Sequence, residues 1–199
     1  MEKLVGTLRI DKLRPIGILP SFYKLFSIVL ALLAGDRLTE LRSRQFAFRP
    51  GFQVAEPVFI LNQIIEKSIE FAFPLVIADM DIWKAYDSAE FSELLQAADR
   101  VHLPRILTAA WLRELSGMSS IFIMSSSSQS EVVRRMRSLV QGDPIRSLSL
   151  FNLILDGPVF EFEQECRRKG WGFNMDGFAV PIILFADNCW LLAKGPKEL

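Results

Sequence analysis

Histidine and cysteine are scarce in this chain, and their scarcity excludes several classes of site. His102 is the only histidine among 199 residues, so neither a histidine-based triad nor a histidine-rich metal centre can be built from this chain alone. Cys166 and Cys189 have no metal-ligand spacing and form no disulfide framework. This usage is typical of a protein in a reducing compartment.

Net charge is also missing: 23 lysines and arginines balance 23 acids. The total therefore does not indicate a nucleic-acid binder, but the distribution is uneven. Residues 1–50 carry nine basic and four acidic side chains, so the rest of the chain is acidic. A basic lobe for phosphates beside an acidic lobe for metals suits a polymerase. A chance fluctuation of charge would look similar, and both readings stay open.

Long hydrophobic runs are absent too. The stretch 25–34 is apolar, but a membrane-spanning helix needs about 20 such residues. Asp11 and Arg14 precede that stretch, which does not fit a signal peptide. We expect a soluble intracellular protein. Because 50% of the residues are hydrophobic, we also expect a packed core and not a disordered chain.

Apolar periodicity and turn residues divide the chain into mixed helices and strands. Helices are predicted over residues 22–41, 54–71, 89–100, 104–115 and 145–169. Interruptions are predicted at Gly35-Asp36 in the first and at Gly157-Pro158 in the last, with Ser21 and Ser88 as N-caps. A short strand that ends in a turn is predicted over residues 45–51, and further strands over 74–82 and 119–124. A hairpin is predicted over 178–193, with its turn at residues 186–188.

A first acidic segment, Asp-Ile-Trp-Lys-Ala-Tyr-Asp, opens at Asp81 where the strand 74–82 ends. Side chains alternate along a strand, so Asp79 and Asp81 point to the same face. Carboxylates beside an apolar run need a partner, and Mg²⁺ prefers such oxygen ligands. For Asp81 by itself, an acidic strand end that simply faces water is the alternative.

Two further segments follow. Gln-Gly-Asp-Pro at 141–144 precedes the last predicted helix; Gly142 would allow close approach of the backbone to a ligand, and Gln141 offers an amide. Phe-Ala-Asp-Asn at 185–188 occupies the turn of the predicted hairpin and carries Asp187.

In this order the three segments resemble the reverse transcriptase domain of non-LTR (LINE-type) retrotransposons. The resemblance runs from about Arg14 to Ala193 and includes Arg-Pro-Ile at 14–16 and Gln-Phe-Ala-Phe-Arg-Pro-Gly at 45–51, which are similar to the family's finger motifs. It implies an α+β fold: a right-hand polymerase palm, an antiparallel sheet with helices on one face, with partial fingers. Residues 1–73 would form the basic fingers segment and residues 74–199 the palm, ending before a thumb.

The resemblance also implies an activity and its partners. The family copies an RNA template into DNA from a DNA primer and deoxynucleoside triphosphates, with two Mg²⁺ ions that Mn²⁺ can replace. A longer polyprotein with a thumb, and with an endonuclease in some members, is implied, as is a nuclear location for an active element. No membrane partner is expected.

Site residues follow from the same match. Asp81 and Asp187 would be the catalytic metal ligands, and Tyr86 would exclude a 2′-hydroxyl. Nucleotide or template contacts would come from Gln141, Gly142 and Arg49. Phosphate contacts are also expected from a set of basic side chains: Lys12, Arg14, Arg134 and Arg135.

One residue departs from the family pattern. The terminal motif usually ends in Asp-Asp, whereas Asn188 stands at the second position. An amide oxygen can ligate a hard cation weakly but brings no charge, and Asp79 could compensate. A catalytically inactive element remnant that keeps the fold, with or without nucleic-acid binding, is therefore the alternative to an active polymerase.

Overall fold

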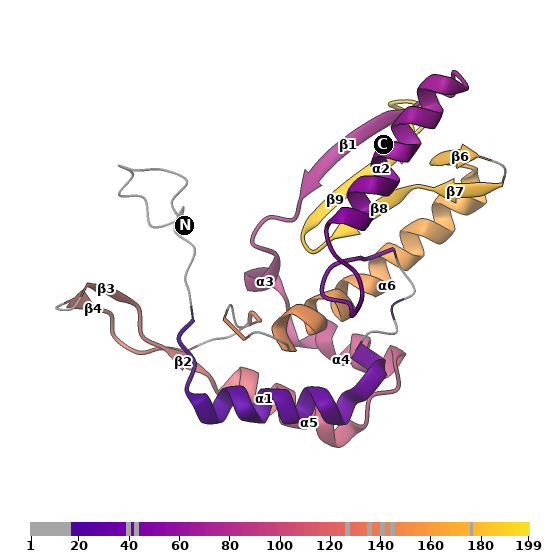
Figure 1. Ribbon diagram of the computed structural model, residues 1–199. Helices are drawn as coiled ribbons and strands as arrows, with labels where there is room; N and C mark the ends of the chain where they lie inside the picture. The colour runs from indigo at the N-terminus through magenta and orange to yellow at the C-terminus, as the bar shows by residue number, and fades with distance from the viewer. Residues whose placement is uncertain are drawn as a thin grey trace.

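The structure is a computed structural model, and it describes residues 17–38, 41, 44–125, 128–134, 137–139, 142–143, 146–175 and 177–199. Four of the predicted contact residues lie outside these ranges: Lys12, Arg14, Arg135 and Gln141. The described part has two regions, a sheet with its helices and a helical region beneath it (Figure 1).

An antiparallel sheet forms the upper region. Its strands are β1 (Val76–Asp81), β8 (Ile182–Phe185) and β9 (Asn188–Ala193), in the order β1-β9-β8. β8 and β9 form the predicted hairpin, and β9 lies between β8 and β1. The sheet thus joins two segments about 100 residues apart in the sequence, which is how the first and last acidic motifs come to meet.

Helices cover both faces of this sheet. On one face Ile64 of α2 (Ala55–Glu70) packs with Ile183, and on the other Val159 of α6 (Arg146–Lys169) packs with Ile182. Figure 1 shows α2 and α6 on opposite sides of the strands. The prediction of helices on one face only is therefore wrong. β8 is apolar on both faces, and both must be covered.

The lower region is helical and packs around Trp111, which is fully buried. Its elements are α1 (Ser21–Ala34), η2 (Gly35–Leu38), α4 (Phe91–Arg100) and α5 (Arg105–Gly117). The first half of α6 closes this core through Leu150 and Leu153. One helix therefore takes part in both hydrophobic cores, which couples the two regions.

The predicted interruption of α6 is wrong, because the helix runs without a break through Pro158 for 24 residues. Its middle is held from outside: the Arg100 guanidinium donates to the Leu153 carbonyl at 3.1 Å. A Cβ at Gly157 would lie 2.6 Å from the centre of that guanidinium, so the absence of a side chain there lets Arg100 approach.

Other helix limits agree with the sequence in part. The break after α1 is confirmed, since Gly35 ends the helix with φ 58°. The two serine caps are wrong: Pro20 precedes α1, and α4 begins with a capping box between Glu90 and Glu93. A short helix, α3 (Ala85–Ser88), takes up the residues expected to start α4.

Three small two-stranded sheets complete the fold. They pair β2 (Ser119–Ser120) with β5 (Val133–Arg134), β3 (Ile123–Ser125) with β4 (Ser128–Gln129), and β6 (Phe173–Met175) with β7 (Phe178–Val180). Within the described ranges, no helix is both long and apolar enough to cross a bilayer.

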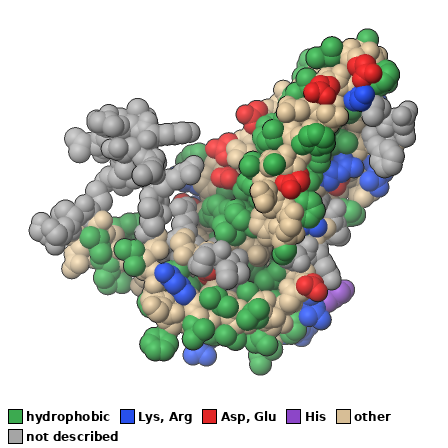
Figure 2. Space-filling model, in the orientation of Figure 1, with side chains coloured by type: hydrophobic (Ala, Val, Ile, Leu, Met, Phe, Trp, Pro, Cys, Tyr) green, Lys and Arg blue, Asp and Glu red, His purple; other side chains and the backbone are tan. Residues whose placement is uncertain are grey.

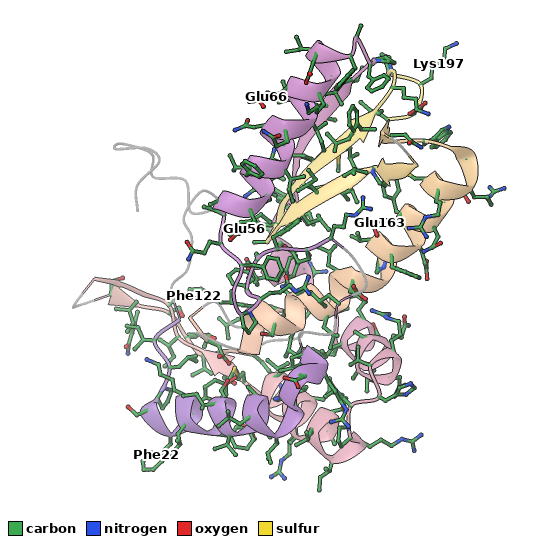
Figure 3. All side chains as sticks on the ribbon, turned by 45° about the vertical axis from the view of Figure 1, so that its right-hand side comes forward. Phe22, Glu56, Glu66, Phe122, Glu163 and Lys197 are labelled. Carbon is green, nitrogen blue, oxygen red and sulfur yellow. The ribbon has the colours of Figure 1, made fainter. Side chains whose placement is uncertain are left out.

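α1 presents an apolar face to solvent. Phe22 is 88% exposed and projects away from the body of the molecule at the start of the helix (Figure 3), and Leu32 is 75% exposed. These side chains lie opposite the buried face of α1, which packs through Leu30 and Ala34 into the helical core.

Candidate active site

The β8–β9 hairpin carries Asp187 at its turn. Phe185 and Asn188 are the last paired residues, so Ala186 and Asp187 form a two-residue connection. Ala186 has φ 57°, the left-handed conformation that tight hairpin turns need at this point. The Asp187 carbonyl accepts a hydrogen bond from the Ile82 amide at 3.1 Å, which ties the turn to the end of β1.

Asp81 lies directly opposite Asn188 at the last register position of β1 and β9. Directly opposed residues of an antiparallel pair point to the same face and are close in space. Both side chains are exposed, and Asp187 beside them is half-buried. The pairing places the three residues predicted to bind metal, Asp81, Asp187 and Asn188, at one end of the sheet.

Asp79 stands two residues before Asp81 and faces the same side of the sheet, opposite Trp190. It is exposed as well. Figure 2 shows acidic side chains gathered along the outer edge of the sheet region, where β1 is the edge strand. Burial and the Asp79 charge together raise the pKa of the Cys189 thiol to about 11, which keeps that thiol neutral.

The donor atoms at this strand end are those that a hard divalent cation takes. Two carboxylates and one amide oxygen, from Asp81, Asp187 and Asn188, are accessible and lie on adjoining backbone positions. No group of three His, Cys, Asp or Glu side chains that could hold a metal ion occurs among the described residues. Asn188 brings an amide where a third carboxylate would complete such a group with Asp81 and Asp187.

Tyr86 belongs to α3 and reaches the same area. Its ring packs against Phe151 of α6, with 4.9 Å between ring centroids. Partial burial, with the nearby Asp187 carboxylate as the second cause, raises the pKa of the Tyr86 hydroxyl to about 12. The phenol is therefore held neutral next to the hairpin turn, with its ring fixed by α6.

The segment before α6 passes beside α3. The Leu139 amide donates to the Tyr86 carbonyl at 2.8 Å, and the Ser138 amide donates to the Ala89 carbonyl at 3.0 Å. Gly142 follows with φ 110°. A Cβ there would lie 2.3 Å from the Gly17 carbonyl oxygen, so this position requires glycine for two independent reasons.

Asp143 anchors the same segment in the interior. It is only 2% exposed, and its two carboxylate oxygens lie 3.0 and 2.8 Å from the Ser27 hydroxyl of α1, which is buried too. In the structure its contact with Ser27 links the Gln-Gly-Asp-Pro segment to the helical region.

Two of the basic side chains predicted to contact nucleotide or phosphate, Arg49 and Arg134, lie within the described residues. Arg49 donates to the Gln45 carbonyl at 3.1 Å, and its guanidinium lies 5.0 Å from the centroid of the Phe52 ring. Arg134 is exposed on β5, opposite Ser119. Phosphate contact by either residue stays a prediction.

Sequence reasoning missed Gln45 as a residue of this site. It is 1% exposed, and its side-chain amide contacts the backbone on both sides of Ala186. The available signal was an uncharged polar side chain inside an otherwise apolar and basic segment, which is weak because glutamine is common on surfaces.

Comparison with known proteins defines the class. Residues 6–199 match the protein family described as "Reverse transcriptase (RNA-dependent DNA polymerase)", and the chain belongs to this family.

Within it, the chain is 28% identical over 200 residues to the Retrovirus-related Pol polyprotein from type-1 retrotransposable element R2 of Nasonia vitripennis. It is 24% identical over 179 residues to the R2 polyprotein of Popillia japonica. The predicted kinship with non-LTR retrotransposon reverse transcriptases is thereby confirmed. The matches cover 100% and 90% of this chain but 19% and 24% of the relatives, so the chain spans about a fifth of their length.

Solved structures support the fold. Apo telomerase from Candida tropicalis, truncated from its C-terminal domain, aligns with a TM-score of 0.61 at 9% identity, over 89% of this chain and 36% of that one. Telomerase from Candida albicans, in complex with a fragment of telomeric RNA, aligns with a TM-score of 0.51 at 10% identity, over 88% and 31%. The mixed α/β fold with antiparallel sheets is therefore similar to that of telomerase reverse transcriptase.

Proposed function

We propose that this chain is the fingers and palm part of a retrotransposon polymerase that copies RNA into DNA. The observation that carries the proposal is the pairing of Asp81 with Asn188, next to Asp187 in the hairpin turn. Family membership gives the class of reaction, and the strand register supplies the acidic end at which it would take place.

In this proposal Asp81 and Asp187 hold two Mg²⁺ ions, and Asn188 adds a weak amide ligand. The ions, when bound, would favour ionisation of the primer 3′-hydroxyl and neutralise charge on the leaving pyrophosphate. The chain's own contribution is geometry: β1, β9 and the two-residue turn hold the oxygen donors at one strand end before substrate arrives.

The proposed reaction adds one deoxynucleotide to the 3′ end of the primer and releases pyrophosphate. The 3′-oxygen of the primer forms a bond to the α-phosphorus of the deoxynucleotide, and the bond from that phosphorus to the bridging oxygen breaks. Pyrophosphate leaves with the electron pair of that bond, and the hydroxyl proton passes to solvent. No oxidant or further reactant is needed.

Tyr86 would face the sugar of the incoming nucleotide and exclude a 2′-hydroxyl. Its ring is held by Phe151, so a ribose oxygen could not be accommodated by a simple rotation of the side chain. Gly142, with Gln141 before it, would contact template or nucleotide. The Arg49 guanidinium has five N–H donors. One of them donates to the Gln45 carbonyl, and the remaining donors suit a phosphate group.

Primer extension tests the proposal. The assay supplies an RNA template, a DNA primer and one deoxynucleotide with Mg²⁺ or Mn²⁺, and the chain is compared with Asp81→Ala and Asp187→Ala. We expect one-nucleotide addition by wild type and a loss of at least about 100-fold in both variants. Asp99→Ala, an exposed carboxylate change on α4, should leave the rate unchanged.

A second candidate is a folded element remnant without catalysis, and Asn188 is the observation that favours it. It predicts no extension by wild type but extension by Asn188→Asp, because restoring a carboxylate would restore the metal site. Extension that survives Asp81→Ala would contradict the first proposal.

A further inference from the structure

Gln45 makes more contacts with the hairpin turn than its place in the sequence suggests. Its Nε2 donates to the Ala186 carbonyl at 3.1 Å, and its Oε1 accepts from the Ala186 amide at 2.9 Å. The same Oε1 accepts from the Ala47 amide at 3.0 Å. One side chain therefore satisfies both backbone polar groups of Ala186.

Those two groups need a partner. Ala186 is 7% exposed, so an amide and a carbonyl left unpaired there would be buried away from water. Ala186 also has φ 57°, a conformation that residues other than glycine rarely adopt. The hydrogen bonds to Gln45 are formed in this backbone conformation and stabilise it.

The loop that carries Gln45 is itself fixed. The Phe46 amide donates to the Leu184 carbonyl at 3.0 Å, and the Leu184 amide donates to the Arg44 carbonyl at 3.3 Å. From α6, the Asn152 amide donates to the Ala47 carbonyl at 2.6 Å. The loop therefore lies along β8 like a short parallel strand and is anchored to the long helix.

We infer that Gln45 is a positioning residue for Asp187: its side-chain amide fixes the backbone of Ala186 and thereby the direction of the next carboxylate. This inference rests on the proposed function, in which Asp187 is a metal ligand. Gln45 would not touch metal or substrate. It would act through the turn, much as outer-shell partners hold metal ligands in other sites.

Two variants separate the contacts. Gln45→Met keeps the length of the side chain and removes all three described hydrogen bonds of the amide. Gln45→Glu keeps the acceptor but loses the donor and sets a carboxylate against the Ala186 carbonyl. The matched control is Ile64→Ala, which creates a cavity under the same sheet without touching the turn.

The test combines Mn²⁺ affinity, by electron paramagnetic resonance, with amide exchange at Ala186, by nuclear magnetic resonance. We expect Gln45→Met to weaken Mn²⁺ binding about tenfold or more, and to speed exchange at Ala186 about tenfold while exchange at Leu191 stays slow. Gln45→Glu keeps the two hydrogen bonds that Oε1 accepts, so it should weaken Mn²⁺ binding less than Gln45→Met does. Ile64→Ala should lower the free energy of unfolding but keep the Mn²⁺ affinity.

Unchanged affinity in Gln45→Met, when Asp187→Ala loses binding, would overturn the inference. If wild type binds no Mn²⁺, the proposed function fails separately, and amide exchange alone decides whether Gln45 fixes the turn. Unchanged exchange at Ala186 in Gln45→Met would then overturn the inference as well.

Discussion

At the scale of single residues, the substitution of asparagine for aspartate at position 188 has a defined structural setting. Asn188 stands directly opposite Asp81, at the end of the paired strands. The negative charge that aspartate would bring is therefore absent next to Asp81 and not in a neighbouring loop. Asp79 lies on the same face, two register positions before Asp81 on β1. Its exposed carboxylate could add negative charge to the site but is offset along the strand.

Tyr86 gives a measurable signal at this scale. We expect the Tyr86 hydroxyl to titrate near pH 12, and Asp187→Asn to lower its pKa, because the carboxylate disfavours a nearby phenolate. Absorbance at 295 nm measures the titration, and the difference from Tyr86→Phe isolates this residue. Asp99→Asn is the control and should change nothing; an identical titration in Asp187→Asn would contradict the described proximity.

The same shift has a consequence for stability. The folded protein holds the Tyr86 proton more tightly than the unfolded chain, in which a tyrosine titrates near 10. The free energy of unfolding therefore falls as pH rises from about 10 to 12, and Tyr86→Phe removes that part of the loss.

At the scale of elements, the segment before α6 depends on glycine. Gly142→Ala places a Cβ 2.3 Å from the Gly17 carbonyl oxygen at φ 110°, and we expect a loss of more than about 2 kcal/mol in the free energy of unfolding.

Two other glycines serve as controls for the separate causes. Gly170→Ala has φ 70° but open space, and should lose about 1 kcal/mol from backbone conformation alone. Gly117→Ala, in the last turn of α5, meets neither obstacle and should be neutral or slightly stabilising. Urea denaturation measures all three, and equal losses at positions 142 and 170 would contradict the close approach of Gly17.

Elements with strong local patterns were predictable from sequence. The helix at 55–70, the strand at 76–81 and the terminal hairpin follow from apolar periodicity and turn residues. The N-caps were not predictable in the same way. Pro20 takes the place of Ser21 before α1, and the Glu90–Glu93 pair takes the place of Ser88 before α4. The sequence near each helix start offers both residues, and packing decides between them. The continuity of α6 through Pro158 could not be predicted either. The first part of the helix packs in the helical core and the later part against the sheet, and these contacts are made by residues distant in the sequence.

Only the charged residues of the candidate site could be predicted from the sequence, and their role as metal ligands stays a prediction. Asp81 and Asp187 follow from the family pattern, and β1–β9 pairing brings their segments together. Gln45 and Ser27 could not be predicted, since their partners lie more than 100 residues away in the sequence.

At the scale of the whole molecule, α6 joins the helical core around Trp111 to the sheet. Packing also crosses the predicted boundary at residue 73: Leu30 of α1 lies in the same core as Trp111, and Ile64 of α2 packs on Ile183. The division into fingers and palm stays a prediction, but the two regions share their packing and we expect them to unfold together.

Ile183→Ala tests this coupling. It should lower the free energy of unfolding by about 2–5 kcal/mol, and by the same amount whether the helical core or the sheet is observed. Trp111 reports on the first and Trp190 on the second, each kept as the single tryptophan with phenylalanine at the other three positions. Two transitions at different urea concentrations would contradict the coupling.

Asp81 and Asp187 are proposed to form one metal site at the end of the sheet. Electron paramagnetic resonance of Mn²⁺ with a deoxynucleoside triphosphate tests it most directly, on wild type, Asp81→Ala, Asp187→Ala and Asn188→Asp, after circular dichroism shows that each is folded. Asp99→Ala is the control for loss of an exposed carboxylate.

The proposed shared site predicts that Mn²⁺ binding is lost in both alanine variants of the site and kept in Asp99→Ala. Binding should be tighter in Asn188→Asp, where a carboxylate replaces a neutral ligand. Binding of equal strength in folded wild type, Asp81→Ala and Asp187→Ala would contradict it.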